Sequence, residues 1–349
     1  MYLVSHPLKA KHTLKKPGRK KTATMQNNIA SSNSTLIQPA GFYIVGLRSM
    51  PYSNVYVMFL TVLFVITVIC NVFLISIIVY DQRLHVPKFM AVGNLAAVDL
   101  ILSTALVPGM IKTYIALDNF VPFNLCLLQM YIYYTCTCLE SFSLCILSYD
   151  RFIAICFPLR HESINTNSRM AYIISAVWFF CVVTLLYAVF SILTLSFCGS
   201  NEMNSYFCDY TPVLVLACSD ITQQLNYATA ATILFIGVAS IFIFFTYIGI
   251  LRAVFRMKSS QSRFKALATC TEHLVLVCLY FVPIVIIFNL TFFGIIWSPN
   301  VGLVCLSLSS LLPPCVNPVI YSLKTKEIRS RVYSLFTRRL FVHPLKNGH

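Results

Sequence analysis

Two acidic side chains lie inside long apolar stretches of the sequence, where carboxylates are rarely found. Asp99 and Glu140 are the only acids deep within these stretches. A carboxylate at the centre of a bilayer costs about 2.5–3.5 kcal/mol on insertion scales, so it usually faces a polar cavity. We expect both acids to face the interior of a helix bundle, near Asn71 and Asn317. Such a cluster can hold a cation or rearrange during a switch. The alternative is a hydrogen-bond network that only fixes helix packing.

Four cysteines form a second candidate cluster. Cys126 begins one apolar stretch, and Cys198, Cys208 and Cys218 lie in the long segment between two others. Disulfides persist on the oxidising outer side of a membrane, so two bridges are expected, with three pairings open. The other ten cysteines lie in or near the apolar stretches, where we interpret them as packing residues. No paired CxxC spacing indicates a metal site, and no catalytic motif of the HExxH, GxSxG, GxGxxG or P-loop type occurs.

The composition indicates what must position these residues. Of 349 residues, 58% are hydrophobic and 11% are charged, whereas a soluble protein carries about 25% charged residues. The chain is therefore not a pair of soluble domains. Seven stretches are long enough to cross a membrane as helices: residues 55–79, 90–111, 126–149, 170–197, 225–251, 266–290 and 301–323. Strands of a membrane barrel would be about half as long and alternating. The sequence predicts an all-α, seven-transmembrane helix bundle.

The basic residues indicate the orientation of this bundle. The formal net charge is +15. With the N-terminus outside, 17 of the 26 Lys and Arg residues fall on the inner side, and only Arg48 and Lys112 fall on the outer side after residue 25. Short loops rich in Lys and Arg stay in the cytoplasm. We therefore predict an outer N-terminus and an inner C-terminus, and no nucleic-acid partner.

The ends of the chain divide into three further parts. Residues 1–24 hold seven basic residues and no acid, so we expect a dispensable N-terminal extension. Residues 25–54 form an outer tail in which Asn33 begins a glycosylation pattern. The bundle takes up residues 55–323. Residues 324–349 form an inner tail that begins with a short amphipathic helix, basic on one side, for the lipid surface.

Four blocks of sequence on the predicted inner side resemble one known family. Residues 148–160 (SYDRFIAICFPLR) resemble the pattern MAYDRYVAICxPLRY, and residues 84–89 (LHVPKF) resemble LHxPMYxF. Residues 265–274 (KALATCTEHL) resemble KAFSTCxSHL, and residues 314–323 (PCVNPVIYSL) resemble PxLNPxIYSL. Together they resemble the odorant receptors among the rhodopsin-like G-protein-coupled receptors. The alternatives are a rhodopsin-like receptor outside smell and, from a different class, a membrane transporter.

The resemblance implies roles for several residues. It implies the disulfides Cys126–Cys208 and Cys198–Cys218, which would pin a loop over the pocket mouth. It implies that Arg151 pairs with Asp150 at rest and, in the active state, helps to form a G-protein cleft. The cleft and the helix distortion beside it would involve Tyr247, Asn317, Pro318 and Tyr321. Asn71, Asp99 and Glu140 would join Asn317 in a relay that can hold a sodium ion, and no other cofactor is expected.

A ligand pocket is expected in the outer half of the bundle. Helical spacing places Met130, Tyr133, Tyr134 and Thr137 on the inward face of the third span. We place five residues across from them: Phe235, Phe281, Val285, Phe288 and Ser307. A strongly charged ligand would need a loop residue such as Asp209 or Lys112.

The family also implies the signal. Phe281-Val282-Pro283 resembles the fish-like branch of odorant receptors, which is associated with water-soluble odorants. The receptor would act at the plasma membrane and activate the stimulatory olfactory type of G protein, which raises cyclic AMP. An amine receptor would carry an acid where Tyr133 and Tyr134 stand.

Overall fold

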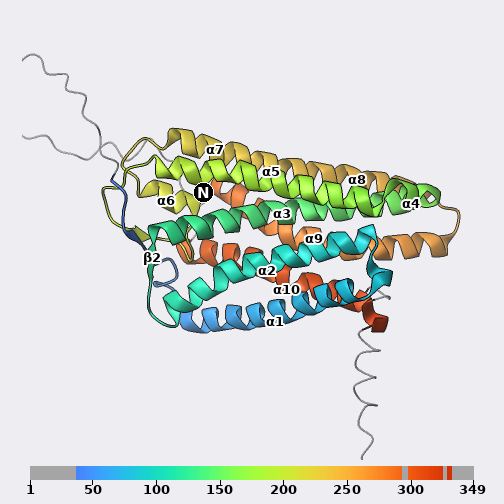
Figure 1. Ribbon diagram of the computed structural model, residues 1–349, viewed down its shortest axis with the longest axis horizontal. Coiled ribbons are helices and arrows are strands. Elements are labelled where there is room, and N and C mark those ends of the chain that lie inside the picture. The colour runs from blue at the N-terminus through green and yellow to red at the C-terminus, as the bar shows by residue number, and fades with distance from the viewer. Residues whose placement is uncertain (1–36, 293–297, 325–327, 332–349) are drawn as a thin grey trace, which may run out of the picture.

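The long apolar stretches form long helices, because a helix pairs every interior backbone N–H and C=O within its own segment. The computed structural model describes residues 37–292, 298–324 and 328–331 (Figure 1). The long helices are α1 (Ser53–Tyr80), α2 (Pro87–Tyr114), α3 (Phe123–Cys156), α5 (Asn167–Leu193), α7 (Thr222–Thr232), η3 (Ile233–Gly237), α8 (Val238–Arg256), α9 (Ser260–Phe292) and α10 (Pro299–Lys324). Of these, α7, η3 and α8 form one continuous rod in which η3 is a π-helical turn.

Six of these rods are long and apolar enough to cross a membrane, with α7, η3 and α8 counted as one. A seventh span is present if the two halves of α9, Ser260–Ala268 and His273–Ile287, are one bent helix; they meet at 43°. This agrees with the bundle that the composition predicts. The helices begin and end within a few residues of the predicted spans.

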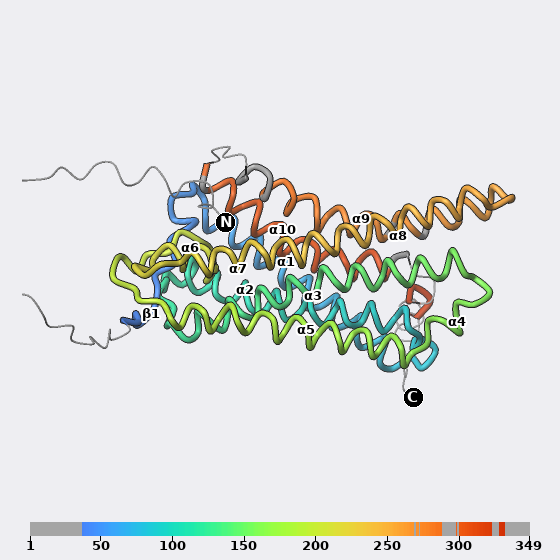
Figure 2. Tube along the Cα trace, turned by 90° about the horizontal axis from the view of Figure 1, so that it is seen from above, coloured from blue at the N-terminus to red at the C-terminus, as the bar shows by residue number. Residues whose placement is uncertain are grey.

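Helix α3 runs through the middle of the bundle (Figures 1 and 2). In the most apolar 18-residue stretch of α3, 72% of the residues are buried, against 11% in α5 and 28% in α1. It contacts α2, α5, α8 and α9 along its length. Residues of α3 can therefore take part in sites at either end of the bundle and in its centre.

The short elements gather at the two ends. At one end, here called the sheet end, a three-stranded sheet has the order β2-β1-β3. Its strands are β1 (Gly41–Ile44), β2 (Phe120–Pro122) and β3 (Glu202–Met203), and helix α6 (Tyr210–Val215) lies beside them. The opposite end, here called the Arg151 end, holds η1 (Gln82–Leu84), η2 (Pro158–Arg160) and α4 (His161–Ile164).

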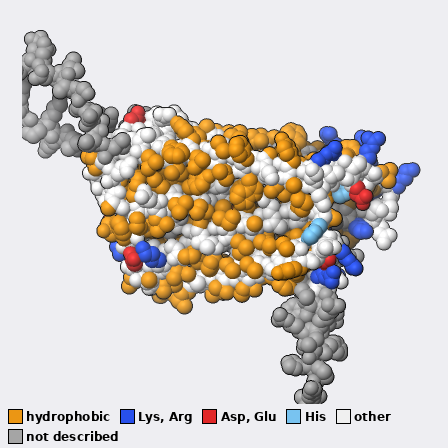
Figure 3. Space-filling view, in the orientation of Figure 1, with side chains coloured by type: hydrophobic (Ala, Val, Ile, Leu, Met, Phe, Trp, Pro, Cys, Tyr) orange, Lys and Arg blue, Asp and Glu red, His pale blue; other side chains and the backbone are white. Residues whose placement is uncertain are grey.

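The surface shows a wide apolar belt between the two ends. In Figure 3, hydrophobic side chains cover the middle of the visible face and most Lys and Arg side chains gather at the Arg151 end. Large side chains such as Phe179, Phe244 and Phe245 are more than 60% exposed on the belt. A soluble protein rarely exposes so large a patch. The belt fits contact with lipid tails.

Candidate functional site

A segment of the loop after α5 covers the sheet end of the bundle. This segment, Ser205–Cys208, is here called the roof, and all four of its residues are buried. A disulfide joins Cys208 to Cys126 at the start of α3, with Cα atoms 5.2 Å apart. A second disulfide joins Cys198 to Cys218, with Cα atoms 5.8 Å apart. These are the pairings that the family resemblance implies.

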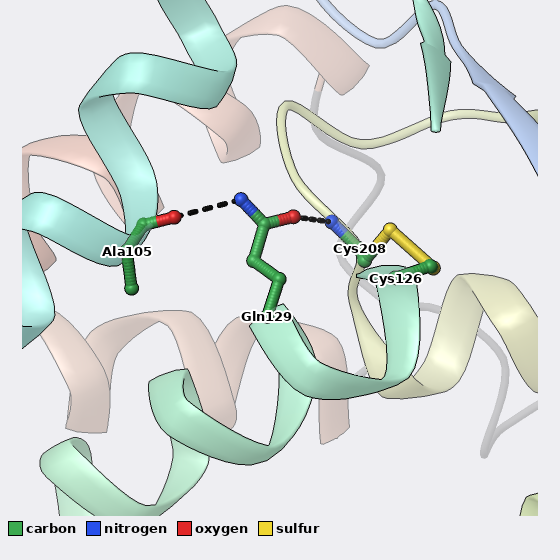
Figure 4. The surroundings of a disulfide bond; sticks show 4 residues. All are labelled: Ala105, Cys126, Gln129 and Cys208. Atoms are coloured by element: carbon green, nitrogen blue, oxygen red, sulfur yellow. Dashed lines mark hydrogen bonds between the residues drawn. A yellow bond between two sulfur atoms is a disulfide. The ribbon is translucent and has the colours of Figure 1, made fainter. Parts of the chain in front are cut away.

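A glutamine supports the roof beside the first disulfide. The side chain of Gln129 on α3 donates a hydrogen bond from Nε2 to the carbonyl of Ala105 on α2, at 2.8 Å. Its Oε1 accepts a 3.1 Å hydrogen bond from the backbone N–H of Cys208 (Figure 4). Gln129 therefore ties two helices and the roof together at one point.

Below the roof, aromatic rings fill the space between the helices. Phe207 packs on Tyr133 with ring centroids 4.3 Å apart, and Tyr206 packs on Phe207 at 4.8 Å. The hydroxyl of Tyr133 lies 3.1 Å from that of Ser310 on α10. The Tyr134 hydroxyl donates a 2.5 Å hydrogen bond to Asp209 Oδ1, directly after the roof. Aromatic walls with a few fixed polar groups are typical of small-molecule sites.

The predicted pocket residues do not all face this space. Met130, Tyr133, Phe235, Phe281 and Ser307 are buried, and Tyr134 and Thr137 are partly buried. Val285 is 44% exposed, so it is not part of the packed interior, and the side chain of Phe288 lies outside the described residues.

Two of the buried residues have other partners. Ser307 lies 2.6 Å from the Tyr56 hydroxyl of α1, so it joins α1 to α10 and does not face α3. Phe235 packs between Phe142 and Phe180, with centroids 6.1 and 5.7 Å away. It therefore belongs to an aromatic cluster of α3, α5 and η3.

A tyrosine on α9 lies between the pocket and the centre of the bundle. The Tyr280 hydroxyl donates a 2.7 Å hydrogen bond to the carbonyl of Thr137 and lies 2.8 Å from the hydroxyl of Ser141. Both partners are on α3. A ligand that moves α9 against α3 must strain or break these contacts.

The four buried residues that the sequence groups together, Asn71, Asp99, Glu140 and Asn317, are here called the polar core; Asp99 contacts Asn317 and Glu140, and Asn71 contacts the backbone of α10. Asn317 Nδ2 donates a 2.9 Å hydrogen bond to Asp99 Oδ2, and Glu140 lies within hydrogen-bonding reach of Asp99. Asn71 Nδ2 donates to the carbonyl of Pro314 at 3.0 Å. All four side chains are at most 5% exposed.

The polar core borders a small cavity. Its lining is Leu95, Glu140, Leu144, Leu276, Tyr280, Pro313 and Asn317. It has room for about one water molecule or bare ion. Asp99 Oδ1, Glu140 Oε1 and Asn71 Oδ1 are buried and have no hydrogen-bond partner among the described residues. A hard cation prefers oxygen ligands of this kind.

At the Arg151 end, Asp150 and Arg151 point to different partners. Asp150 Oδ1 accepts a 2.8 Å hydrogen bond from Asn165 Nδ2 and lies 3.8 Å from His161 Nε2. No ion pair joins Asp150 to Arg151 in the part of the chain that the structure describes. This differs from the resting pair that the resemblance implies, because the loop amide of Asn165 already occupies the Asp150 carboxylate.

Arg151 is instead a neighbour of residues on α8 and α9. It is 9% exposed, and its charge acts on Tyr247, Cys270 and His273. The Tyr247 hydroxyl lies 2.7 Å from Nδ1 of His273. Tyr321 is also buried at this end, three residues after Pro318 of α10. Arg151 thus lies where α3, α8 and α9 meet.

Comparison with known proteins identifies this arrangement. The family model described as olfactory receptor matches residues 60–339. Human olfactory receptor 51D1 is 33% identical over 320 residues, which cover 89% of this chain and 96% of that protein. The chain belongs to the olfactory receptor family. Human olfactory receptor 10G4 is 32% identical over 318 residues, covering 90% of this chain and 99% of that protein. Mouse olfactory receptor 51E2 is 31% identical over 303 residues, covering 85% and 93%.

Family membership decides among the classes that the sequence left open. An olfactory receptor is a multi-pass G-protein-coupled receptor of the plasma membrane and not an enzyme. It responds to small molecules and couples to a G protein. Family membership therefore favours an odorant receptor over the transporter and over a receptor of another rhodopsin-like family.

Several contact residues of this olfactory receptor were missed in the sequence. Ser310, Phe207 and Tyr206 line the space under the roof, and His273 contacts Tyr247. The signal for Ser310 was available, since it lies about one helical turn after Ser307. Asn33 and most of the inner tail lie outside the described residues.

Proposed function

We propose that this olfactory receptor binds a small, water-soluble odorant in the sheet-end half of the bundle, with that end outside the cell. The observation that carries the proposal is the buried cluster of aromatic rings and hydroxyl groups under the disulfide-pinned roof. Tyr133, Tyr134 and Ser310 offer hydroxyl groups there, and Phe207 offers an apolar face. A pocket of this composition fits a ligand with one polar group and a short apolar body.

The charge distribution supports an outer sheet end. The loops of the Arg151 end carry the excess of Lys and Arg, and such loops are retained in the cytoplasm. In this orientation both disulfides face the oxidising side. Asn33, a glycosylation acceptor pattern, then lies on the outer tail. The basic Arg151 end faces the anionic inner leaflet.

We further propose that the active receptor couples to the stimulatory olfactory type of G protein and raises cyclic AMP. A ligand shifts a receptor only by its differential affinity for the two states. Tyr280 of α9 contacts Thr137 and Ser141 of α3, and these contacts lie between the proposed pocket and the polar core. Movement of α9 there changes the surroundings of Arg151, where the G protein would bind.

Cells that express the full chain test this function with a cyclic AMP reporter. The probes are straight-chain alcohols, carboxylic acids, amines and amino acids. We expect at least one water-soluble probe to raise cyclic AMP in a saturable manner, and vector-transfected cells to stay silent. A receptor that reaches the surface and responds to no probe contradicts the proposed ligand class.

The polar core is proposed to hold a sodium ion in the resting state. Asp99, Glu140, Asn71 and Asn317 would supply the oxygen ligands, and the alternative is a proton shared by the two carboxyl groups. With sodium bound at rest, replacing external choline by sodium lowers the potency of an activating probe. Asp99→Asn removes this dependence, whereas Asp118→Asn on the outer loop keeps it. Equal potency in both salts contradicts the sodium site and favours the shared proton.

A further inference from the structure

The N-terminal strand β1 lies against the loop that carries the roof. It is the central strand of the sheet, antiparallel to β2 and parallel to β3. Beyond the sheet, the backbone N–H groups of Val45 and Gly46 donate to the carbonyls of Met203 and Ser205, at 3.0 and 3.1 Å. The chain just before α1 therefore runs beside the loop down to the first residue of the roof.

Gly46 has no room for a side chain at this contact. A Cβ atom placed on Gly46 would lie 2.5 Å from both the carbonyl carbon and the oxygen of Ser205. Real Cβ atoms essentially never approach backbone this closely, so Gly46 or Ser205 must move if Gly46 is replaced. The neighbouring contacts resist a shift of β1, because the buried Phe42 ring packs on Phe123 and Phe197.

A shift of Ser205 is transmitted to the ligand space. Ser205 is fully buried, and the next two residues, Tyr206 and Phe207, pack beneath it against Tyr133. The buried Tyr206 hydroxyl lies close to the hydroxyls of Tyr133 and Ser310. Cys208 is fixed by its disulfide. Because Cys208 is held in place, a displaced Ser205 moves the rings of Tyr206 and Phe207, which lie between these two residues.

We propose that Gly46 is a positioning residue for the odorant pocket. The contact between Gly46 and Ser205 sets how deep the roof lies, and the roof limits the size of the odorant. This inference rests on the proposed function, because it assigns the space under the roof to the ligand. The N-terminal segment is then part of the binding machinery, although it does not touch the ligand.

The position of β1 can be tested without any odorant. Tyr43 and Glu202 are paired in the sheet register, and both are exposed. Paired strands lie about 4.8 Å apart, within the range for a disulfide. We expect Tyr43→Cys with Glu202→Cys to form a bridge. After cleavage at a protease site placed in the loop of residues 82–88, that bridge alone joins the two fragments, since both native disulfides lie in the second one.

The single variants Tyr43→Cys and Glu202→Cys are the controls, and their fragments must separate on a non-reducing gel. If the fragments of the double variant also separate, β1 does not lie beside β3, and the proposal is overturned. That result stands whether or not any probe activates the receptor. A silent wild-type receptor contradicts the proposed function instead, so the two failures are distinguishable.

The role of Gly46 is tested with Gly46→Ala and two matched glycine variants. Gly199→Ala, in the same loop as the roof, places a Cβ with nothing within 4 Å. Gly41→Ala, in the same strand, places a Cβ 2.2 Å from the Val121 carbonyl of β2 and therefore strains the sheet away from the roof. The probes are a homologous series of straight-chain acids or alcohols, and potency is compared at equal surface density.

We expect Gly46→Ala to lower the potency of the longest active probe by about tenfold relative to the shortest, in the range typical of overpacking. Gly199→Ala and Gly41→Ala should keep the wild-type ratio between long and short probes. An unchanged ratio in Gly46→Ala overturns the proposal, as does the same change in Gly41→Ala. If Gly46→Ala does not reach the surface at 37 °C while Gly41→Ala does, Gly46→Ala expressed at reduced temperature provides the ratio.

Discussion

Single polar contacts hold the roof to the helices beneath it. The Tyr134 hydroxyl donates a hydrogen bond to Asp209, and Gln129 accepts one from the backbone N–H of Cys208. The hydroxyls of Tyr133 and Ser310 are in contact. Hydrogen bonds to a charged group contribute about 1.5–3 kcal/mol, roughly twice a neutral one. The contact of Tyr134 with the Asp209 carboxylate is therefore the one whose loss we expect to disturb the roof most.

Tyr134→Phe tests this contact. It removes the donor and leaves the partly buried Asp209 carboxylate without it, at a cost of about 1–3 kcal/mol. We expect a loss of probe potency of roughly tenfold or more in the cyclic AMP assay. Asp209→Asn is the control, because its amide oxygen still accepts from Tyr134. If the two variants lose potency equally, the hydrogen bond does not explain the effect.

The sequence could place the buried acids more firmly than the residues predicted for the pocket, some of which face other neighbours in the structure. An acid in an apolar helix has to face the bundle interior, so Asp99 and Glu140 could be placed from their type alone. A serine or valine carries no such constraint. Ser307, which contacts α1, and Ser310, which contacts α3, are three residues apart and so differ by only about 60° around the helix axis. Helical periodicity shows which residues share one face of a helix. It does not show which neighbouring helix that face contacts.

At the scale of elements, the helices follow from composition and the sheet does not. A stretch of more than 20 apolar residues can satisfy its backbone in a membrane only as a helix. The four residues of β1 find their partners in loops about 80 and 160 residues away. No local pattern in Gly41–Ile44 distinguishes that strand from an ordinary tail, so the sequence predicts only an outer tail over residues 25–54.

A second long-range contact ties the end of α1 to Arg331, beyond α10. Arg331 donates to Asp81, which lies at the end of α1. This hydrogen bond lowers the pKa of Asp81 below its ordinary value, and it raises that of Arg331. The stabilisation is therefore present above the ordinary pKa of an aspartate and is lost only as the pH falls through the lowered value. At neutral pH the contact is complete.

Asp81→Asn removes the charge of this contact and weakens it at neutral pH. We expect trypsin to cut after Arg331 several times faster in the solubilised variant than in the wild-type receptor at neutral pH. Asp118→Asn, at the sheet end, is the control and should leave the rate unchanged. Equal rates in Asp81→Asn and the wild type would show that Asp81 does not hold the segment after α10.

At the scale of the whole molecule, buried apolar side chains form two clusters, one toward each end. One cluster includes Phe42, Tyr133 and Phe207 at the sheet end. The other includes Tyr247 and Tyr321 at the Arg151 end. Tyr280 belongs to the second cluster and shares a small cavity with Glu140 and Asn317 of the polar core, and α3 passes through both clusters. A structural change caused by a bound ligand can therefore pass between the two ends along α3 and through its contacts with α9 and α10.

The central claim is that a ligand bound under the roof acts on a G protein through Arg151. The most direct measurement is the cyclic AMP response to an activating probe in cells that express the wild type, Arg151→Ala or the inner-loop control Arg160→Ala at equal surface density. We predict a saturable response in the wild type and in Arg160→Ala, and loss of that response in Arg151→Ala. A full response in Arg151→Ala would contradict the account.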